Sequence, residues 1–339
     1  MTYTARQPND APPRRTRRKR RTGRNVLIVL VVLLLALAGF GLYVDMSLKR
    51  EDALPAGGER PAAGPGTNWL LVGSDSREGL DAERQAELGT GDAAGRRTDT
   101  MMLVHIPESG GEPTMVSLPR DSYVRIPGKG KDKLNAAFAY GGPELLSRTV
   151  EGATGVRIDH YAEIGLGGFA DITDAVGGVD LCVKERMTDP KASLDLQPGC
   201  QTVNGPQALG YVRSRASSRG DLDRVEHQRE FLAALTERAS SPQVLLNPFR
   251  LFPLITDTSG AFLVGRDEHV WHLGALAFAM NGIASGKGIT TTVPMSGFGE
   301  SSDGASVIKW DAEKAAQLFG ALAKDEPVPA GAAGAGFGG

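Results

Sequence analysis

The densest set of chemically capable side chains lies in the 18 residues from Tyr211 to Gln228. A guanidinium presents a planar fork of N–H donors that matches phosphate oxygens, so several converging arginines suit a pyrophosphate group. A solvated basic surface strip is the alternative that this stretch alone leaves open. The polar members of the stretch are Arg213, Arg215, Arg219, Asp221, Arg224 and Gln228.

The local pattern predicts which of these side chains share a face. Arg213 and Arg215 alternate in the run YVRSR, which predicts an extended segment with both guanidinium groups on one side. Arg224 and Gln228 are four residues apart in a predicted helix from Leu222 to Ala239, so they share a helical face. The buried stripe of that helix is expected to contain Val225, Phe231, Leu232 and Leu235.

Charged residues also border three short apolar runs. Asp75 follows the run 68–73, Asp99 precedes the run 100–106, and Arg120 follows the run 114–118. These runs predict buried strands, and ligands of open α/β sheets bind at the carboxyl ends of strands. Mg²⁺ is bound by one or two carboxylates together with phosphate oxygens, and Asp75 and Asp99 could supply such carboxylates.

Phosphoryl transfer also needs a group that takes the proton of the acceptor hydroxyl. Asp121 or Asp221 could do so, although a pairing with Arg120 or a turn cap is the alternative for Asp121. Lys133 and Asn135 could contact sugar or phosphate, or could serve the loop alone.

Predicted helices and strands alternate along the chain, which favours an α/β layered domain. The predicted helices cover residues 142–155, 168–176, a short segment from Pro206 to Leu209, 249–255 and 270–284, and further strands cover 161–164, 179–183 and 290–293. The last third carries no cluster of chemical groups in sequence, so it is expected to be scaffold.

The N-terminal region predicts a membrane anchor. Val26 to Val44 contains no charge, and 19 residues of helix span roughly 28 Å, close to the hydrocarbon thickness of a bilayer. Nine of the 38 Lys and Arg residues lie in residues 1–25, which predicts a cytoplasmic N-terminus and a single-pass topology. A cleaved signal peptide is the alternative, but the apolar run is long and no A-x-A site follows it.

The expected division is a basic tail (1–25), a transmembrane helix (26–44), a linker (45–66), an extracytoplasmic domain (67–326) and a Gly/Ala-rich tail (327–339). The two cysteines, Cys182 and Cys200, then lie where disulfides persist, and a bridge across the loop-like segment between them is expected. Zinc is not expected, because none of the five histidines shows metal-ligand spacing.

Several function classes lack their signatures. The chain contains no GxxxxGK[ST], HExxH or GxSxG motif, which argues against a P-loop NTPase, a zinc peptidase and a serine hydrolase of the elbow type. It also shows no helix-turn-helix pattern or zinc finger, so no nucleic-acid partner is expected.

Six blocks occur in a fixed order: NWLLVGSDS, RRTDTMMLVHI, TMVSLPRDSYVRIPG, KDKLNAAFAYGG, FADITDAVGGVD and ALGYVRSR followed by DLDRVEHQ. Together they resemble the LytR–CpsA–Psr family over most of residues 67–240. The resemblance implies an α/β/α sandwich around a mixed central sheet, with a hydrophobic groove for a polyprenyl chain. It also implies a Mg²⁺-dependent phosphotransferase that moves a glycopolymer from a polyprenyl-pyrophosphate carrier onto peptidoglycan.

The resemblance also implies residue roles. The magnesium ligands of the family match Asp75 and Asp99, and catalytic roles fall to Arg120, Asp221 and Arg224. One position departs from the family pattern, because His227 stands where many members have an arginine. The implied pyrophosphate ligands are Arg96, Arg97, Arg120, Arg213, Arg215, Arg224 and Gln228.

Two other functions fit some of these features. A pyrophosphatase acting on the same lipid carrier would use the same side chains with water as acceptor. An envelope-linked transcriptional regulator is less well supported, since the arginine-rich stretch is expected across the membrane from DNA.

Overall fold

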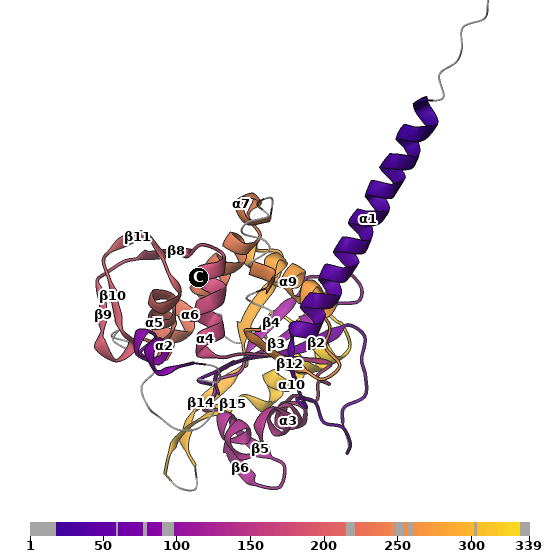
Figure 1. The fold of residues 1–339 in the computed structure, drawn as a ribbon. Coiled ribbons are helices and arrows are strands. Elements are labelled where there is room, and N and C mark those ends of the chain that lie inside the picture. Colours follow the sequence, from indigo (N-terminus) through magenta and orange to yellow (C-terminus); the bar gives the residue numbers. More distant parts are fainter. Residues whose placement is uncertain are drawn as a thin grey trace, which may run out of the picture. The chain divides into compact units, whose positions relative to one another are not determined.

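A computed structural model describes residues 18–58, 60–76, 80–89, 98–214, 221–245, 247, 254–256, 260–301 and 304–332 (Figure 1). The chain divides into two compact units that meet between Met46 and Ser47. Each unit is considered by itself.

The first unit contains helix α1 (Arg18–Ser47), whose part from Gly23 onward is long and apolar enough to cross a membrane. Its apolar side chains are exposed, with Leu34 and Leu35 at 66% and 67%. Exposed leucines along a helix are typical of a surface that faces lipid. The helix predicted at residues 26–44 is therefore confirmed, and it extends beyond both expected ends.

The second unit is built on a seven-stranded mixed sheet in the order β1-β12-β7-β2-β3-β4-β13. Strands β2, β4, β7 and β13 run in one direction, while β1, β3 and β12 run in the other. The carboxyl ends of four strands and the amino end of β3 therefore meet at one edge. The bounds are β1 (Lys49–Glu51), β2 (Thr67–Ser74), β3 (Thr98–Ile106), β4 (Thr114–Ser117), β7 (His160–Ile164), β12 (Phe262–Gly265) and β13 (Ile289–Thr292).

Helices cover both faces of this sheet (Figure 1). Leu70 and Val72 of β2 belong to the core beneath α3 (Leu134–Thr154) and α10 (Ala312–Ala323). Trp69, on the other face of the same strand, packs in a core with Leu276 of α9 (Val270–Ala284) and Leu232 of α6 (Asp221–Ala239). Alternate residues of a strand point to opposite faces, so a strand buried on both faces is apolar throughout. The predicted α/β/α sandwich around a mixed sheet is confirmed.

A second core lies beside the sheet and joins α4 (Leu166–Ala175), α5 (Gly205–Arg213) and α6 to a set of short strands. The predicted Cys182–Cys200 disulfide is confirmed, and it links directly opposed residues of two antiparallel strands of this part. The remaining elements here are α2 (Ala82–Glu87), β8 (Val179–Val183), β9 (Met187–Asp189), η1 (Pro190–Ala192), β10 (Leu194–Leu196) and β11 (Gly199–Val203).

The segment between the cysteines is not the loop that its composition indicates. It forms an antiparallel β9–β10 pair, because Leu194 and Leu196 alternate with Asp195 and are both buried. Further short elements elsewhere are the β-hairpins β5 (Tyr123–Ile126) with β6 (Gly130–Lys133) and β14 (Met295–Glu300) with β15 (Ser306–Trp310), and helix α7 (Pro242–Leu245).

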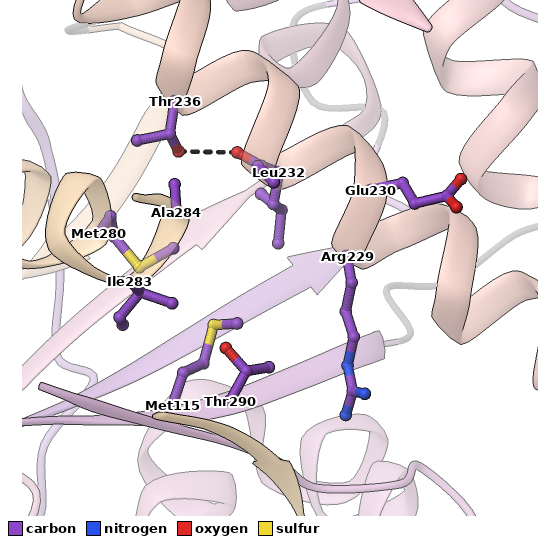
Figure 2. A pocket seen from close by; sticks show the side chains of 10 residues that line it. Met115, Arg229, Glu230, Leu232, Thr236, Met280, Ile283, Ala284 and Thr290 are labelled. Carbon is purple, nitrogen blue, oxygen red and sulfur yellow. Dashed lines mark hydrogen bonds between the residues drawn. The ribbon is translucent and has the colours of Figure 1, made fainter. Parts of the chain in front are cut away.

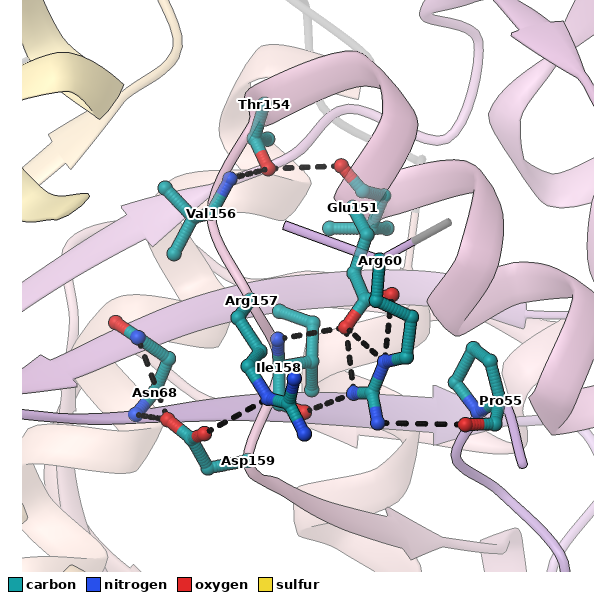
Figure 3. Close-up of polar contacts among 10 residues, drawn as sticks. Pro55, Arg60, Asn68, Glu151, Thr154, Val156, Arg157, Ile158 and Asp159 are labelled. Atoms are coloured by element: carbon teal, nitrogen blue, oxygen red, sulfur yellow. Dashed lines mark hydrogen bonds and ion pairs between the residues drawn. The ribbon is translucent and has the colours of Figure 1, made fainter. Parts of the chain in front are cut away.

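Of the expected linker at residues 45–66, residues 47–66 belong to the second unit. Strand β1 joins the sheet, and Ala53 is buried in the main core. Arg60 forms an ion pair of 2.6 Å with Glu151 near the end of α3 and donates a 2.7 Å hydrogen bond to the carbonyl of Ile158 (Figure 3). A glycine- and proline-rich composition does not prevent a segment from docking when one charged side chain reaches a buried partner.

Two predictions of secondary structure need correction. The run YVRSR is not an extended strand, because Tyr211, Val212 and Arg213 form the last residues of α5. That helix begins at a capping box between Asn204 and Gln207, which fixes its start and carries it past the expected end at Leu209. The helix predicted from Gly142 is the second half of α3, which is broken at Gly141–Gly142 and resumes at Pro143.

Other helix predictions are confirmed by the structure. Gly155 ends α3 in the left-handed conformation, as its place after the predicted helix indicates. The helices predicted at 222–239 and 270–284 are confirmed as α6 and α9. Most of the helix predicted at 249–255 lies outside the described residues.

Candidate functional site

The register of β2 and β3 brings the two predicted magnesium ligands to one edge of the sheet. Ser74 pairs with Thr98, and the register shifts there, so Asp99 lies in a bulge while Asp75 is the residue just beyond the pair. The long polar loop between these aspartates therefore starts and ends at the same place. A bulge also turns a strand locally and redirects its side chains.

Arg120 joins this edge from the segment after β4. Its Nη1 atom donates a 2.6 Å hydrogen bond to Asp99, and its Nε atom lies 3.3 Å from a carboxylate oxygen of Asp121. The other oxygen of Asp121 accepts a 2.8 Å hydrogen bond from the Nζ atom of Lys133. Asp99, Arg120, Asp121 and Lys133 thus form one continuous chain of charges, which is called the polar edge below.

The start of α3 holds the Arg120 segment in place. The backbone N–H of Leu134 donates to the carbonyl of Ser122, and that of Asn135 donates to the carbonyl of Arg120. The first N–H groups of a helix have no partner within it, so these two bonds satisfy the helix and fix the loop together. Asn135 therefore contributes through its backbone to the geometry of the polar edge.

The cations of the polar edge keep Asp121 ionised. Burial raises the pKa of Asp121, but the hydrogen bond from Lys133 and the charge of Arg120 lower it by more, so the pKa lies below the usual range. A carboxylate with a lowered pKa is a weak base, which favours a role in orienting Arg120 and Lys133.

An apolar cavity of about 390 Å³ opens between the sheet and the helices α6 and α9 (Figure 2). Its floor contains Met115 of β4 and Thr290 of β13, and the two helices supply most of the walls. The wall residues are Arg229, Glu230, Leu232, Ala233, Thr236, Met280, Ile283 and Ala284.

Arg229 connects this cavity to the carboxyl edge of the sheet. Its side chain points from α6 toward the strands in Figure 2, and its Nη2 atom donates to the hydroxyl of Thr292 at 2.6 Å and contacts that of Ser117 at 3.5 Å. Ser117 and Thr292 are the last residues of β4 and β13, and Ser117 lies three residues before Arg120. The cavity and the polar edge are therefore neighbours.

The charge of Arg229 has no anionic partner among the described residues. No carboxylate there pairs with it, and its Nε atom is buried with no hydrogen-bond partner in this part of the chain. Burial lowers the pKa of Arg229, although an arginine stays protonated at neutral pH. A half-buried cation of this kind is suited to an anionic ligand, because an anion would restore the electrostatic balance lost on burial.

The other residues predicted from the sequence at this site lie in different surroundings. The guanidinium of Arg213 donates to the carbonyls of Leu88 and Gly89, beyond α2, at 3.2–3.4 Å. The ring of His227 lies against that of Tyr211 in a tilted arrangement, with centroids 4.4 Å apart. Arg96, Arg97 and Arg215 lie outside the described residues, as do the side chains of Asp221 and Arg224 on α6 and residue Arg219.

Arg229 was not among the residues singled out from the sequence, although a signal was present. It lies four residues after Val225 and three before Leu232, which places a charge on the apolar stripe of α6. A charged residue on the buried face of an amphipathic helix is rarely placed there without a partner or a ligand.

The model of the LytR_cpsA_psr family matches residues 48–324. The chain belongs to this family. It is 56% identical over 282 residues, or 83% of its length, to the probable cell wall biosynthesis protein LcpB of Corynebacterium glutamicum. It is also 36% identical over 197 residues, or 56% of its length, to TagT of Bacillus subtilis, a polyisoprenyl-teichoic acid–peptidoglycan teichoic acid transferase. The matches cover 66% and 57% of these relatives, so a third or more of each lies outside the match.

Solved structures of the LytR_cpsA_psr family share the fold. A LytR-Csp2A-Psr enzyme from Actinomyces oris superposes with a TM-score of 0.63 over 82% of this chain and 96% of that protein, at 21% identity. A structure of TagT bound to LI-WTA superposes with a TM-score of 0.57 over 82% of this chain and 98% of that protein, at 25% identity.

Proposed function

We propose that this protein is a membrane-anchored phosphotransferase that moves a glycopolymer from a polyprenyl-pyrophosphate carrier onto a hydroxyl of peptidoglycan. The observation that carries the proposal is the position of Arg229. Its charge pairs with no carboxylate among the described residues, and it stands between a largely apolar cavity and the polar edge. A polyprenyl pyrophosphate has the matching parts, an apolar chain joined to an anionic head. The activity for which TagT is named, transfer of teichoic acid to peptidoglycan, is of the same kind.

In this reaction the hydroxyl oxygen attacks the phosphorus that bears the glycopolymer. A new P–O bond forms, the bond from that phosphorus to the bridging oxygen breaks, and polyprenyl phosphate leaves with the electron pair. Arg120 and Arg229 stabilise the negative charge on the phosphates, and Lys133 holds Asp121 in position beside Arg120. Because the pKa of Asp121 is lowered, Asp221 is the better candidate to take the hydroxyl proton.

Asp75 and Asp99, the second of which belongs to the polar edge, fit a magnesium ion. Asp75 and Asp99 bring two carboxylates to one end of β2 and β3, and the Asp99 side chain is about half exposed, so it is accessible to a hydrated ion. Bound Mg²⁺ would neutralise part of the pyrophosphate charge and orient it. Arg120 holds one oxygen of Asp99, which would orient that carboxylate toward the ion.

The proposed orientation places the N-terminus in the cytoplasm and the second unit outside it. The basic residues before the apolar part of α1 support this orientation. A phosphatase reporter fused after Gly66 should be active in intact cells, and a reporter that works only in the cytoplasm should be inactive at the same position. The reverse pattern would contradict the orientation.

The test of the transfer reaction uses the full chain in liposomes with a labelled lipid-linked glycopolymer, Mg²⁺ and peptidoglycan. Label should become attached to peptidoglycan through a phosphodiester, and Arg120→Ala should abolish the attachment. A matched control is Arg84→Ala, since Arg84 forms exposed ion pairs with Glu87 and Asp171 away from the cavity lining.

Analysis of the reaction products distinguishes transfer to peptidoglycan from hydrolysis of the lipid carrier. Release of free glycopolymer phosphate at the same rate with and without peptidoglycan would identify a pyrophosphatase and reject the transferase. Full transfer by Asp99→Ala with magnesium chelated would reject the metal assignment alone.

A further inference from the structure

Three side chains with metal-binding atoms lie close together at the start of strand β7. His160 is the first residue of β7, Glu268 lies two residues before α9, and His272 is in the first turn of that helix. One ligand atom from each lies within 4.8 Å of the other two. Glu268 and His272 are four residues apart, which places them on the same side of the helix start.

Glu268 lies at the centre of this cluster. Both of its carboxylate oxygens lie 2.8 Å from Nδ1 of His160, and one of them lies 3.0 Å from Nδ1 of His272. The residue is only 2% exposed, and neither Lys nor Arg pairs with its carboxylate among the described residues. A buried carboxylate needs a cation or hydrogen-bond donors nearby, and a metal ion held by the two imidazoles would supply the positive charge.

The surroundings fix the three side chains. The ring of Trp69 stacks on His160 with centroids 4.5 Å apart, and the rings of His160 and His272 are 4.6 Å apart. The guanidinium of Arg50 donates two hydrogen bonds, of 3.0 and 3.1 Å, to the carbonyl of Glu268. Oriented ligands are favourable for a metal ion, because little conformational freedom is lost when it binds.

We infer that His160, Glu268 and His272 bind one divalent transition-metal ion, for which Zn²⁺ is the best match. Two imidazole nitrogens and one carboxylate form a common ligand set for Zn²⁺. Ligand atoms of a tetrahedral zinc site lie roughly 3.3–3.6 Å apart, since each is about 2.0–2.2 Å from the ion. The observed separations of 2.8 and 3.0 Å, with none above 4.8 Å, require only a small outward movement of the imidazoles.

The ion would join α9 to the sheet at a distance from the polar edge. Trp69 is paired with His160 and lies five residues before Ser74, so roughly 17 Å of strand separates the cluster from that edge. The other end of α9 supplies Met280, Ile283 and Ala284 to the cavity wall. The metal would therefore stabilise the wall of the cavity from a position outside it.

This inference departs from two expectations from the sequence. The last third of the chain was expected to carry no cluster of chemical groups, and no histidine was expected to bind a metal. Ligand spacing in the sequence does not reveal the cluster, because 108 residues separate His160 from Glu268. The antiparallel pairing of β7 with β12 brings them together.

The experiment uses the full chain in detergent, purified without a histidine tag and stripped with a chelator. Zn²⁺ is titrated by calorimetry in the presence of excess Mg²⁺, and Co²⁺ is added separately because its visible absorption reports the coordination number. The variants are His160→Ala, His272→Ala and Glu268→Gln. His269→Ala is the matched control, since His269 lies beside the cluster and stacks on Trp271.

We expect one Zn²⁺ per chain, four-coordinate Co²⁺ absorption, and a Tm that rises by roughly 5–10 °C when Zn²⁺ is at about 100 times its Kd. Each of the three variants should weaken binding by more than about tenfold, while His269→Ala should not. Asp99→Ala should also bind Zn²⁺ normally, which separates this site from the proposed magnesium site.

Two outcomes would overturn the inference. The first is a stripped protein that takes up no Zn²⁺ in the titration and whose Tm does not respond to it. The second is loss of Zn²⁺ binding in His269→Ala with binding retained in Glu268→Gln.

Discussion

At the scale of single residues, Arg229 is the side chain whose position most requires a ligand. Replacing it with methionine keeps an unbranched apolar stem and removes the charged guanidinium. Arg229→Met should weaken carrier binding roughly ten- to hundredfold, because a hydrogen bond to a charged group contributes about 1.5–3 kcal/mol. The Tm should stay constant or rise, since the substitution removes a half-buried cation that no described carboxylate balances.

The measurement is carrier binding by the full chain in detergent, together with Tm for each variant. Arg238→Met is the control, since Arg238 lies on the same helix outside the cavity lining and donates to Gln243. A large fall in Tm for Arg229→Met would assign the arginine a structural role instead.

Lys133 should control the acid side of the pH–rate profile. Its hydrogen bond helps to hold the pKa of Asp121 below the usual range, against the opposing effect of burial. In Lys133→Met the pKa of Asp121 should rise, so that carboxylate becomes protonated, and Arg120 loses an ionised partner, at a higher pH. Transfer measured across the pH range should therefore fall earlier on acidification.

The control for this prediction is Lys131→Met. Lys131 lies two residues away on the same strand and contacts the ring of Tyr123 rather than Asp121. An acid limb that stays in place in Lys133→Met would show that the ionisation of Asp121 does not limit the reaction.

At the scale of elements, the sequence predicts a strand or helix best when the residues that end it lie next to it in the chain. The strands before Asp75 and Arg120 are apolar runs ending in a glycine or a proline segment, and both were placed correctly. The run at Arg213 was misread because alternation over five residues cannot outweigh a capping box seven residues upstream.

Contacts over long sequence separations could not be predicted in this way. The family resemblance indicates that Asp75 and Asp99 meet, but only the pairing of β2 with β3 shows how. The position of Arg229 at the edge of the sheet could not be predicted, because it depends on the pairing of β13 with β4. This pairing places Thr292 next to Ser117.

The contact between Arg60 and α3 gives a prediction at this scale. The Glu151 side chain is 3% exposed, so Arg60→Ala would leave a buried charge without compensation (Figure 3). The free energy of unfolding should fall by about 3–5 kcal/mol. Removal of Arg84, whose carboxylate partners are exposed, should cost less than about 1 kcal/mol.

Chemical denaturation of the full chain in detergent measures both changes. Glu151→Gln in the Arg60→Ala background should recover part of the loss, because it removes the charge and keeps an oxygen for the backbone N–H of Ile158. Equal losses in the Arg60 and Arg84 variants would mean that residues 53–66 contribute little to the stability of the second unit.

At the scale of the second unit, a buried histidine joins the two ends of the domain. His105 of β3 contacts Asn68 of β2 through Nδ1 at 2.8 Å and Asp325, just beyond α10, through Nε2 at 2.9 Å. Gly66 packs so closely that an added Cβ would lie 2.6 Å from the imidazole. The start of β2 and the end of α10 therefore depend on one side chain.

Asp325 should make this junction sensitive to acid. Burial raises the pKa of Asp325, but the hydrogen bonds from His105 and from the backbone N–H of Ser109 lower it by more, so its pKa lies below the usual value. A carboxyl with a lowered folded pKa stabilises the protein above its unfolded pKa, about 3.9, and this contribution is lost as the pH falls through the folded value. Asp325→Asn should thus lower Tm near neutral pH, with a difference from the unmodified chain that shrinks below about pH 4.

Asparagine is the appropriate replacement because Asp325 has a φ of 57°, a left-handed conformation that asparagine also adopts. Asp311→Asn is the control at the other end of α10, where an asparagine caps a helix as well as an aspartate does. When Tm is measured from about pH 3 to pH 8, the value for Asp325→Asn should approach that of the unmodified chain as the pH falls. The Asp311→Asn variant should show no such change. A constant difference over that range would mean that the junction depends on the shape of the side chain rather than on its charge.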